Sequence, residues 1–393
     1  MKHIAILGFG VVGSGVARLL CENKEEISRL IADRISIDCI LDLREFPDSP
    51  FADRVVHSFD AVLESKVDTV IEAMGGSHPA YEYTVAALKA GMNVITSNKE
   101  VVANYIDEFT ALARENGVVY RYEASVGGGI PIISPLISLL RHNKIREVRG
   151  ILNGTTNYIL TKMFDFGDSF ANALMDAQNR GYAERIPDAD VLGTDACRKI
   201  CILASIISGK RVRPEDVSTV GITGIRAVDI ERLGARQMRI KLVGRAVFGE
   251  EDTAVFVSPH AVPTDKQLSH VAGVYNAIEV ISEPLGDVLF YGQGAGAGAT
   301  ASAMVSDLML TYTEGTAYSA PKIEGELALM PPQKHESRFY AVIKGNTLPS
   351  LFADADVVSR EDGEISFFTE KMTQAAVYAA LAEAELVALY PIL

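Results

Sequence analysis

Three glycines near the start of the chain restrict its fold more than any other feature. Gly8, Gly10 and Gly13 form the pattern G-F-G-V-V-G between a β-rich run, HIAILGFG, and a helical run, VVGSGVARLLCENKEEISRLI. Glycines at this spacing permit a tight turn, a close approach of backbone to a pyrophosphate and close packing of helix on strand. A purely structural turn is the alternative. The position after a strand and before a helix favours a dinucleotide-binding loop, formed by Gly8, Phe9, Gly10, Val11, Val12 and Gly13.

The remainder of the first 130 residues alternates between short β-rich runs and amphipathic helical runs. The β-rich runs include ISIDCILDL, VDTVIEAMGG, NVITSNK and VVYRYEAS, and the stretches PAYEYTVAALKAG and VVANYIDEFTALARENG between them have helical periodicity. Such alternation is typical of βαβ units with a parallel sheet covered by helices on both faces. The sequence therefore predicts an α/β fold that opens with a Rossmann-type, doubly wound domain over residues 1–130.

The residues after the second expected strand bear on the choice of dinucleotide. Asp42 is placed to bond the ribose hydroxyls, which favours NAD, whereas Arg44 is placed to meet a 2′-phosphate, which favours NADP. A solvated loop of mixed charge is the alternative to both. The expectation is therefore NAD(P), with the choice left open.

The rest of the chain indicates two further domains, as its 393 residues also suggest. Residues 131–299 mix helices with irregularly spaced strand-like runs and predict an α+β domain with an open mixed sheet. A long helix at about 300–325 is expected to return to the first domain. After MPPQKHES, residues 335–393 predict a small βα appendage.

Composition narrows the class of partner. A formal charge of −14 disfavours general binding to nucleic acid or anionic membrane surfaces, so a small molecule is expected. Four cysteines and the absence of an apolar leader fit a cytoplasmic location, and no run reaches the roughly 18 apolar residues of a membrane span. Cys197 and Cys201 would share a helix face, which could suggest a pair of metal ligands. No His or second Cys pair accompanies them, and buried free cysteines usually act as small hydrophobes.

Four later segments carry chemistry: TSNKEVVA around Lys99, YEASVGGGIPII, ILNGTTNYIL and GYAERIPDADVLGTDACRKICIL. In this order and spacing they resemble homoserine dehydrogenases over residues 1 to about 325, with GQGAG and TASAMVSDL as a further match. The resemblance implies NAD(P)-dependent interconversion of L-homoserine and L-aspartate 4-semialdehyde, in threonine, methionine and isoleucine biosynthesis. Two departures are Ile186, where the family commonly has aspartate before Pro187, and Ala299, where it usually has proline.

The last of these segments contains a carboxylate and a lysine four residues apart. In a helix that begins near Thr194, Asp195 and Lys199 would share one face, as an exposed ion pair or as a catalytic pair. The resemblance assigns proton transfer to Lys199 and places Lys99 near the nicotinamide and the reacting oxygen. It implies that Glu184, Asp195 and Asp190 bind substrate, and it adds Ser97, Lys99, Gly181 and Gly296 to the cofactor contacts.

The same resemblance suggests a monovalent cation site and an oligomeric state. Glu123 and the carbonyls of Val126, Gly128 and Ile130 would hold a sodium ion, with a tight turn between domains as the alternative. A homodimer that pairs through the sheet of the middle domain is expected.

Two other functions are the alternatives to this one. A phosphorylating semialdehyde dehydrogenase would need a reactive cysteine in a catalytic turn, and none of the four cysteines has such a setting. A noncatalytic dinucleotide sensor would have no need of Lys99, Glu184, Asp195 and Lys199 together.

The tail resembles part of a regulatory domain. Many homoserine dehydrogenases end in an ACT domain of order βαββαβ that binds an effector such as threonine. Here the stretch GNTLPSLFADADVVSREDG leaves little room for a first helix. The sequence therefore predicts a shortened ACT-like domain that stabilises or pairs subunits, with weak or no threonine inhibition. A plain C-terminal packing element is the alternative and would have the same outcome.

Overall fold

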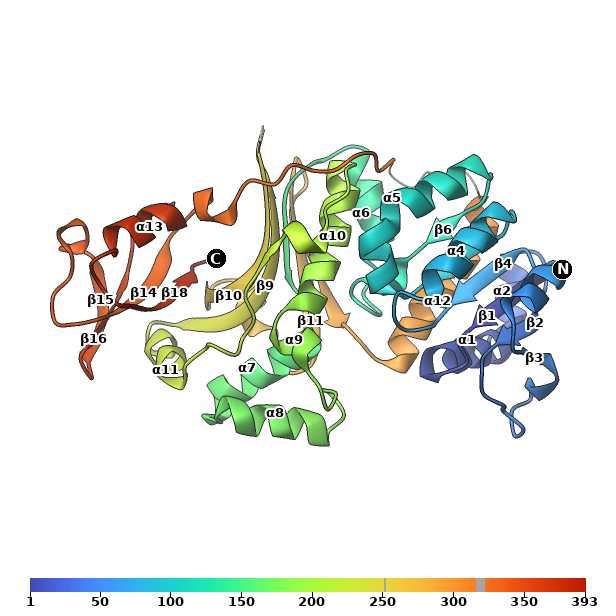
Figure 1. Ribbon diagram of the computed structural model, residues 1–393, viewed down its shortest axis with the longest axis horizontal. Helices are drawn as coiled ribbons and strands as arrows, with labels where there is room; N and C mark the ends of the chain where they lie inside the picture. Colours follow the sequence, from blue (N-terminus) through green and yellow to red (C-terminus); the bar gives the residue numbers. More distant parts are fainter. Residues whose placement is uncertain (251, 316–321) are drawn as a thin grey trace. The chain divides into compact units, whose positions relative to one another are not determined.

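The computed structural model describes residues 1–250, 252–315 and 322–393, which divide into two compact units (Figure 1). The first unit contains residues 1–143, 201–214 and 292–327, and the second contains residues 144–200, 215–291 and 328–393. Within these described ranges, no helix has the length and apolar character needed to cross a membrane.

The first unit is built on a parallel sheet, as the alternation of β-rich and helical runs predicts. Its strand order is β3-β2-β1-β4-β5-β6, with every neighbouring pair parallel. This is a Rossmann-like order in which the sequence direction reverses between β1 and β4. The strands are β1 (Lys2–Leu7), β2 (Ile35–Leu41), β3 (Val55–Val56), β4 (Thr69–Glu72), β5 (Asn93–Thr96) and β6 (Tyr120–Arg121).

Helices from the first 143 residues and one helix from a later segment, α12, belong to the unit that contains this sheet. The helices of the first unit are α1 (Val11–Glu22), α2 (Lys24–Leu30), α3 (Phe59–Glu64), α4 (Ala80–Lys89), α5 (Lys99–Glu115), α6 (Ile133–Leu140) and α12 (Ala297–Glu314). A Cβ added to Gly15 of α1 would lie 3.2 Å from the Cβ of Ala301, so the small residues let α1 and α12 approach closely. Met304 and Leu308 of α12 join Ile4 and Ile6 of β1 in one apolar core.

The second unit contains a mixed sheet, as expected for the middle of the chain. Its order is β12-β11-β7-β9-β10-β8, in which β8 pairs parallel to β10 while β7, β9, β10 and β11 pair antiparallel. The strands are β7 (Lys144–Ile151), β8 (Ser218–Thr219), β9 (Met238–Phe248), β10 (Thr253–Pro263), β11 (Tyr275–Glu283) and β12 (Gly286–Gln293).

Five helices follow or cover strands of this sheet: α7 (Gly154–Phe166), α8 (Phe170–Asn179), α9 (Asp188–Val191), α10 (Thr194–Ser208) and α11 (Ala227–Ala235). The first half of α10 lies directly against β9. A Cβ on Gly244 would be 3.3 Å from the Cβ of Ile200 and 2.9 Å from Leu152, so a larger residue would push α10 off the sheet. Asp195 and Lys199 are therefore carried on a helix that is fixed by close packing.

The tail forms a second small sheet of order β15-β16-β14-β18, with all neighbours antiparallel. Its elements are β14 (Phe339–Lys344), β15 (Asp356–Glu361), β16 (Glu364–Phe368), α13 (Gln374–Ala380) and β18 (Leu386–Pro391). A 3₁₀ turn at Ser350–Phe352 stands where a first helix would be. The stretch around Pro349 is thus too short for that helix, but it still supplies the strand β15, which sequence reasoning missed.

The division into units differs from the three domains expected from the sequence. Residues 131–143 and 201–214 belong to the first unit, and the tail belongs to the second. Polar contacts tie the tail to α11. The Arg226 and Arg232 guanidinium groups form part-buried bonds to Glu364 at 2.7 and 2.8 Å, and the buried hydroxyl of Tyr340 donates to Asp229 at 3.1 Å. These partners are more than 100 residues apart in sequence, so spacing alone does not reveal them.

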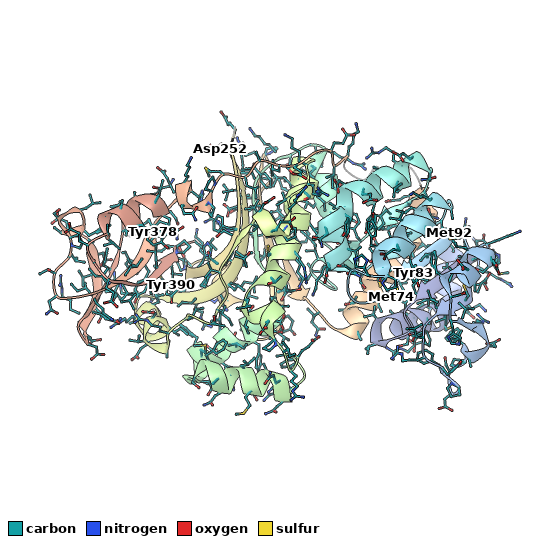
Figure 2. All side chains as sticks on the ribbon, in the orientation of Figure 1. Met74, Tyr83, Met92, Asp252, Tyr378 and Tyr390 are labelled. Atoms are coloured by element: carbon teal, nitrogen blue, oxygen red, sulfur yellow. The ribbon has the colours of Figure 1, made fainter. Side chains whose placement is uncertain are left out.

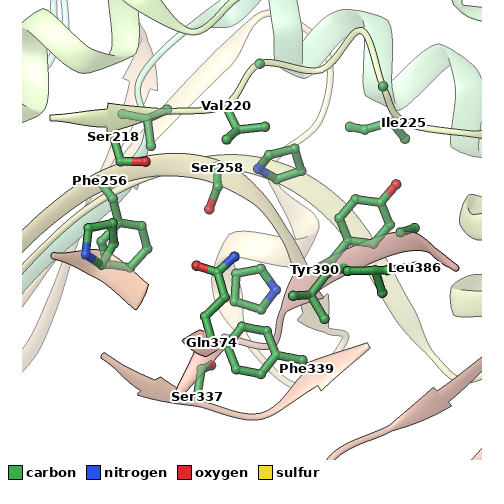
Figure 3. A pocket seen from close by; sticks show the side chains of 18 of the residues that line it. Ser218, Val220, Ile225, Phe256, Ser258, Ser337, Phe339, Gln374, Leu386 and Tyr390 are labelled. Carbon is green, nitrogen blue, oxygen red and sulfur yellow. The ribbon is translucent and has the colours of Figure 1, made fainter. Parts of the chain in front are cut away.

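A cavity of about 490 Å³ lies between the tail and the β8–β10 edge of the mixed sheet (Figure 3). Ser218, Ser258 and Gln374 contribute polar groups, while Phe256 and Tyr390 contribute aromatic rings. None of the described residues lining the cavity is Asp, Glu, Lys or Arg. The cavity is therefore suited to neutral groups.

His260 of β10 makes folding stability depend on pH. The side chain is fully buried, Nδ1 bonds the carbonyl of Ser258 at 2.9 Å, and burial lowers the pKa of this histidine to about 3. Between pH 3 and 6.5 the unfolded chain binds more protons at this position, so the free energy of unfolding falls as pH drops through that window. We expect His260 to account for about 2 kcal/mol of the stability lost between pH 6.5 and 5. In denaturant titrations, the free energy of unfolding of His260→Gln should fall by about 2 kcal/mol less between pH 6.5 and 5 than that of the parent protein. If the two proteins lost the same free energy of unfolding over this interval, the assignment to His260 would be wrong.

Candidate active site

The glycine loop joins β1 to α1 and has the geometry that a dinucleotide requires. Gly8 has φ of +87°, and a Cβ on Gly13 would lie 2.0 Å from the Gly8 carbonyl oxygen, so helix and loop touch through backbone. A Cβ on Gly8 would meet Met74 at 3.0 Å, in the segment after β4 (Figure 2). Gly10 is the N-cap of α1, and a Cβ added there would make only an ordinary contact. The loop thus presents backbone N–H groups at a helix N-terminus, which fits a bound pyrophosphate.

Asp42 and Arg44 form one unit at the end of β2. Asp42 Oδ2 accepts the N–H of Phe9 at 2.8 Å, and the Arg44 guanidinium bonds both carboxylate oxygens, at 3.0 and 2.9 Å. The Arg44 side chain holds the pKa of Asp42 well below its usual range. A Cβ on Gly10 would lie 3.9 Å from Arg44 Nη2, so the guanidinium is held beside the glycine loop.

The ends of β4 and β5 fix the start of α5, where Lys99 lies. Buried Glu72 accepts bonds from Thr96 Oγ1 at 2.5 Å and from the N–H of Met74 at 2.8 Å, and burial raises the pKa of this carboxyl to about 7. Asn98 caps α5 through its Oδ1, while its Nδ2 donates to the Gly76 carbonyl at 2.7 Å. Ser97 and Lys99 flank this cap, so their backbone positions follow from it.

The carboxylate and lysine at the start of α10 form a buried ion pair. Lys199 Nζ donates to Asp195 Oδ2 at 2.7 Å and to the Leu152 carbonyl at 2.7 Å. The two residues are 6% and 3% exposed, which rules out the exposed pair that the spacing alone allowed. A buried ion pair gains little stability relative to apolar residues, so its presence points to a functional use.

Asn153 joins this pair to a second acid. Its Nδ2 donates to Asp195 Oδ2 at 2.9 Å and to Asp190 Oδ1 at 2.7 Å. Asn153 is the N-cap of α7, directly after β7. Asp190, Asp195 and Lys199 are therefore gathered where the end of β7 meets the start of α10.

The third expected substrate carboxylate has a different environment. Glu184 is exposed on the loop between α8 and α9, where its carbonyl accepts Gln178 Nε2 at 3.0 Å. Gly181, with φ of +75°, turns the chain after α8. Ile186 is 73% exposed and Pro187 caps α9, so the departure from the family at Ile186 falls on the surface of this loop.

The segment 123–130 combines a held carboxylate with carbonyls that have no hydrogen-bond partner. The Glu123 carboxylate accepts the N–H groups of Ile132, Ile133 and Ser134, at 2.7, 2.6 and 2.8 Å. No described residue donates a hydrogen bond to the carbonyl oxygens of Val126, Gly128 and Ile130, three buried residues. Buried carbonyls usually have a partner, so this turn is chemically suited to a hard cation. No cluster of three His, Cys, Asp or Glu side chains suited to a metal occurs in the described ranges.

A second carboxyl group lies beside Glu123. Asp307 Oδ2 of α12 accepts the Glu123 N–H at 2.8 Å, and burial together with the charge of Glu123 raises the pKa of Asp307 to about 8. Gly296, with φ of +125°, precedes this same helix. Because this raised pKa favours the protonated form of Asp307 at neutral pH, Glu123 is the carboxylate that carries the negative charge here.

Comparison with known proteins shows which family this chain belongs to. Residues 8–123 match the family description "Homoserine dehydrogenase, NAD binding domain", and residues 131–309 match "Homoserine dehydrogenase". A homoserine dehydrogenase of Neisseria gonorrhoeae is 34% identical over 382 residues, which cover 94% of this chain and 88% of that protein. The chain belongs to the homoserine dehydrogenase family. It is accordingly an NAD(P)-dependent oxidoreductase, as the four segments implied.

Solved homoserine dehydrogenases share the fold. The crystal structure of the Thiobacillus denitrificans enzyme is 30% identical, covers 100% of this chain and 98% of its own, and superposes with a TM-score of 0.91. A hyperthermophilic archaeal homoserine dehydrogenase mutant in complex with NADPH is 28% identical, covers 82% of this chain and 99% of its own, and has a TM-score of 0.68.

For a homoserine dehydrogenase, sequence reasoning found some site residues and missed others. It selected Asp190, Asp195 and Lys199, which the fold brings together, and Glu184, whose side chain is exposed. From the sequence, Asn153 is explained by default as part of a turn and helix cap, while the family resemblance puts its segment, NGTTNYI, by the substrate pocket and subunit interface, and Asn153 was not among the expected catalytic residues. A signal was present, because asparagine is the preferred N-cap residue that also carries two donors.

Proposed function

We propose that this chain oxidises L-homoserine to L-aspartate 4-semialdehyde and catalyses the reverse reduction, with Lys199 as general base and general acid. The buried Lys199–Asp195 pair carries the proposal, because an amine fixed by a carboxylate and a carbonyl needs no reordering to act. The nicotinamide ring of NAD(P), when bound, would supply the hydride acceptor or donor. The glycine loop of the first unit fits the pyrophosphate of that dinucleotide.

As the neutral amine, Lys199 would take the hydroxyl proton as homoserine is oxidised, and as the resulting ammonium it would return that proton to the carbonyl oxygen in the reverse direction. Asp195 stabilises the charged lysine at a position where water has little access. Lys99, at the start of α5, would add positive charge near the developing alkoxide. Three acids, Asp190 of α9, Asp195 of α10 and Glu184 of the loop before α9, would supply negative charge for the ammonium group of the substrate.

One assay tests the reaction. Oxidation of NADPH and of NADH should be rapid with aspartate 4-semialdehyde and absent with glyceraldehyde phosphate or without substrate. Activity with glyceraldehyde phosphate and none with aspartate 4-semialdehyde would overturn the assignment.

The Asp42–Arg44 pair supports NADP as the preferred cofactor. The Arg44 guanidinium occupies both oxygens of Asp42, which leaves that carboxylate poorly placed for ribose hydroxyls and keeps a cation beside Gly10. Arg44→Ala is expected to raise the KM for NADPH about 10- to 100-fold, the equivalent of one charged hydrogen bond, with a small change for NADH.

Steady-state kinetics with both cofactors measure this effect. Arg29→Ala is the matched control, because Arg29 also pairs with a carboxylate, Glu26, but lies on the exposed face of α2. If Arg44→Ala raised the KM for NADPH and the KM for NADH equally, the proposed contact of Arg44 with the 2′-phosphate would be wrong.

We further propose that the turn 123–130 holds a sodium ion and that the enzyme is a homodimer. The carbonyls of Val126, Gly128 and Ile130 and the neighbouring charge of Glu123 support the cation. The family resemblance and the prevalence of two-fold assemblies support the dimer.

The tail is proposed to be an ACT-like domain that lacks effector control. Its element order and antiparallel β15-β16-β14-β18 sheet correspond to βαββαβ with the first helix reduced to a 3₁₀ turn. A free amino acid needs charged partners for both its ammonium and its carboxylate, and the lining of the adjacent cavity supplies none. Activity is expected to change less than two-fold in millimolar threonine. Saturable inhibition that is lost in Gln374→Ala would show that this cavity is an effector site.

A further inference from the structure

We propose that Asn153 is a positioning residue for the substrate site: its amide group holds Asp190 and Asp195 in the arrangement that receives the substrate's ammonium group. The inference rests on the proposed reaction and adds a specific role to a residue that otherwise serves as a helix cap.

The contacts of Asn153 reach two different helices. Nδ2 donates to Asp190 of α9 at 2.7 Å and to Asp195 of α10 at 2.9 Å, and Asn153 is 5% exposed. One amide nitrogen has two hydrogens, so both can be used by the two carboxylates. These bonds tie α9, which carries Asp190, to the buried Lys199–Asp195 pair.

The orientation of the amide follows from its other end. Asn153 Oδ1 accepts the backbone N–H of Thr156 at 2.8 Å, in the first turn of α7. A backbone N–H can only donate, so the oxygen of the amide must face the helix and the nitrogen must face the acids. The N-terminus of α7 thereby sets the direction in which Asn153 presents its donors.

An uncharged donor is suited to this place. Asp190 and Asp195 repel each other, and Lys199 bonds Asp195 directly. With the lysine protonated, the formal charges of these three side chains sum to −1, which attracts an ammonium group. A lysine or arginine at position 153 would cancel that charge, whereas the amide orders both acids and leaves it in place.

Two substitutions separate the positioning role from helix capping. Serine and aspartate cap helices about as well as asparagine, so both substitutions keep the cap of α7. Asn153→Ser should keep the melting temperature close to that of the parent enzyme, whereas Asn153→Asp should lower it, because it adds a buried carboxylate beside two others. Neither supplies two N–H donors. We expect kcat/KM for homoserine to fall roughly 10- to 100-fold in Asn153→Ser, mainly through KM, and further in Asn153→Asp, where a third carboxylate is added.

The pH profile gives a readout that a structural role would not move. Without the amide donors the ionised acids are less favoured, so the acidic limb of kcat/KM should shift about one unit to higher pH in Asn153→Ser. Cofactor affinity should stay within two-fold. Ser169→Ala is the matched control, because Ser169 caps the next helix, α8, by bonding the N–H of Asn172 at 3.2 Å. That variant should keep both kinetics and pH profile.

The possible results distinguish this proposal from the reaction itself. If the parent enzyme oxidises homoserine but Asn153→Ser stays within two-fold of it, the positioning role is wrong and the reaction stands. Asn153→Asp being more active than Asn153→Ser, or an unshifted pH profile in both, would also overturn it. An inactive parent enzyme would overturn the reaction first.

Discussion

Replacing Lys199 by methionine is expected to lower turnover at least ~100-fold, the lower end of general acid–base effects, while the protein stays folded and binds cofactor. The side chain is buried beside Asp195 and the Leu152 carbonyl, and methionine fills much of the same space without a transferable proton. Turnover of homoserine, the melting temperature and the cofactor dissociation constant together measure the effect.

A second buried lysine provides a matched control. Lys241 of β9 is 2% exposed, donates to Asn157 Oδ1 at 3.0 Å and has a pKa that burial lowers to about 7. Lys241→Met also removes a buried amine, but it is expected to change turnover less than three-fold. If Lys199→Met were nearly as active as Lys241→Met, proton transfer would have to be assigned to another group.

The sequence predicted local geometry well because periodicity records which residues share a face. The four-residue spacing of Asp195 and Lys199 became a contact at 2.7 Å, and G-F-G-V-V-G became the turn between β1 and α1. In both cases the interacting residues lie within one or two turns of chain, so their separation follows from helix and strand geometry.

Contacts between distant residues could not be predicted in this way. Asn153 meets Asp190 across 37 residues and Asp195 across 42, and Arg226 meets Glu364 across 138. The local pattern of NGTTNYI indicates a cap residue with two spare donors, but it does not indicate which distant residues those donors meet. The same limit explains why the tail was expected to be separate, although part-buried ion pairs attach it to α11.

The burial of the site changes how its acids should respond to substitution. Asp195 Oδ2 accepts two bonds, from Lys199 Nζ and from Asn153 Nδ2, and the residue is 3% exposed. An asparagine there would remove the carboxylate charge that bonds Lys199 at 2.7 Å and would turn one acceptor oxygen into a donor. Glu184 is exposed, so its replacement disturbs less of the surrounding structure.

Asp195→Asn is therefore expected to reduce kcat/KM for homoserine at least ~100-fold, through both KM and kcat, because leaving a buried charge without its partner is costly. Glu184→Gln should act mainly on KM, about 10-fold. Both should leave the cofactor dissociation constant within two-fold, since the glycine loop belongs to the other unit. Asp188→Asn is the control, because it makes the same chemical change at an exposed position in the first turn of α9. Cofactor binding that weakens as much as homoserine use, or an equal loss in Asp188→Asn, would show that Asp195 does not contact the substrate.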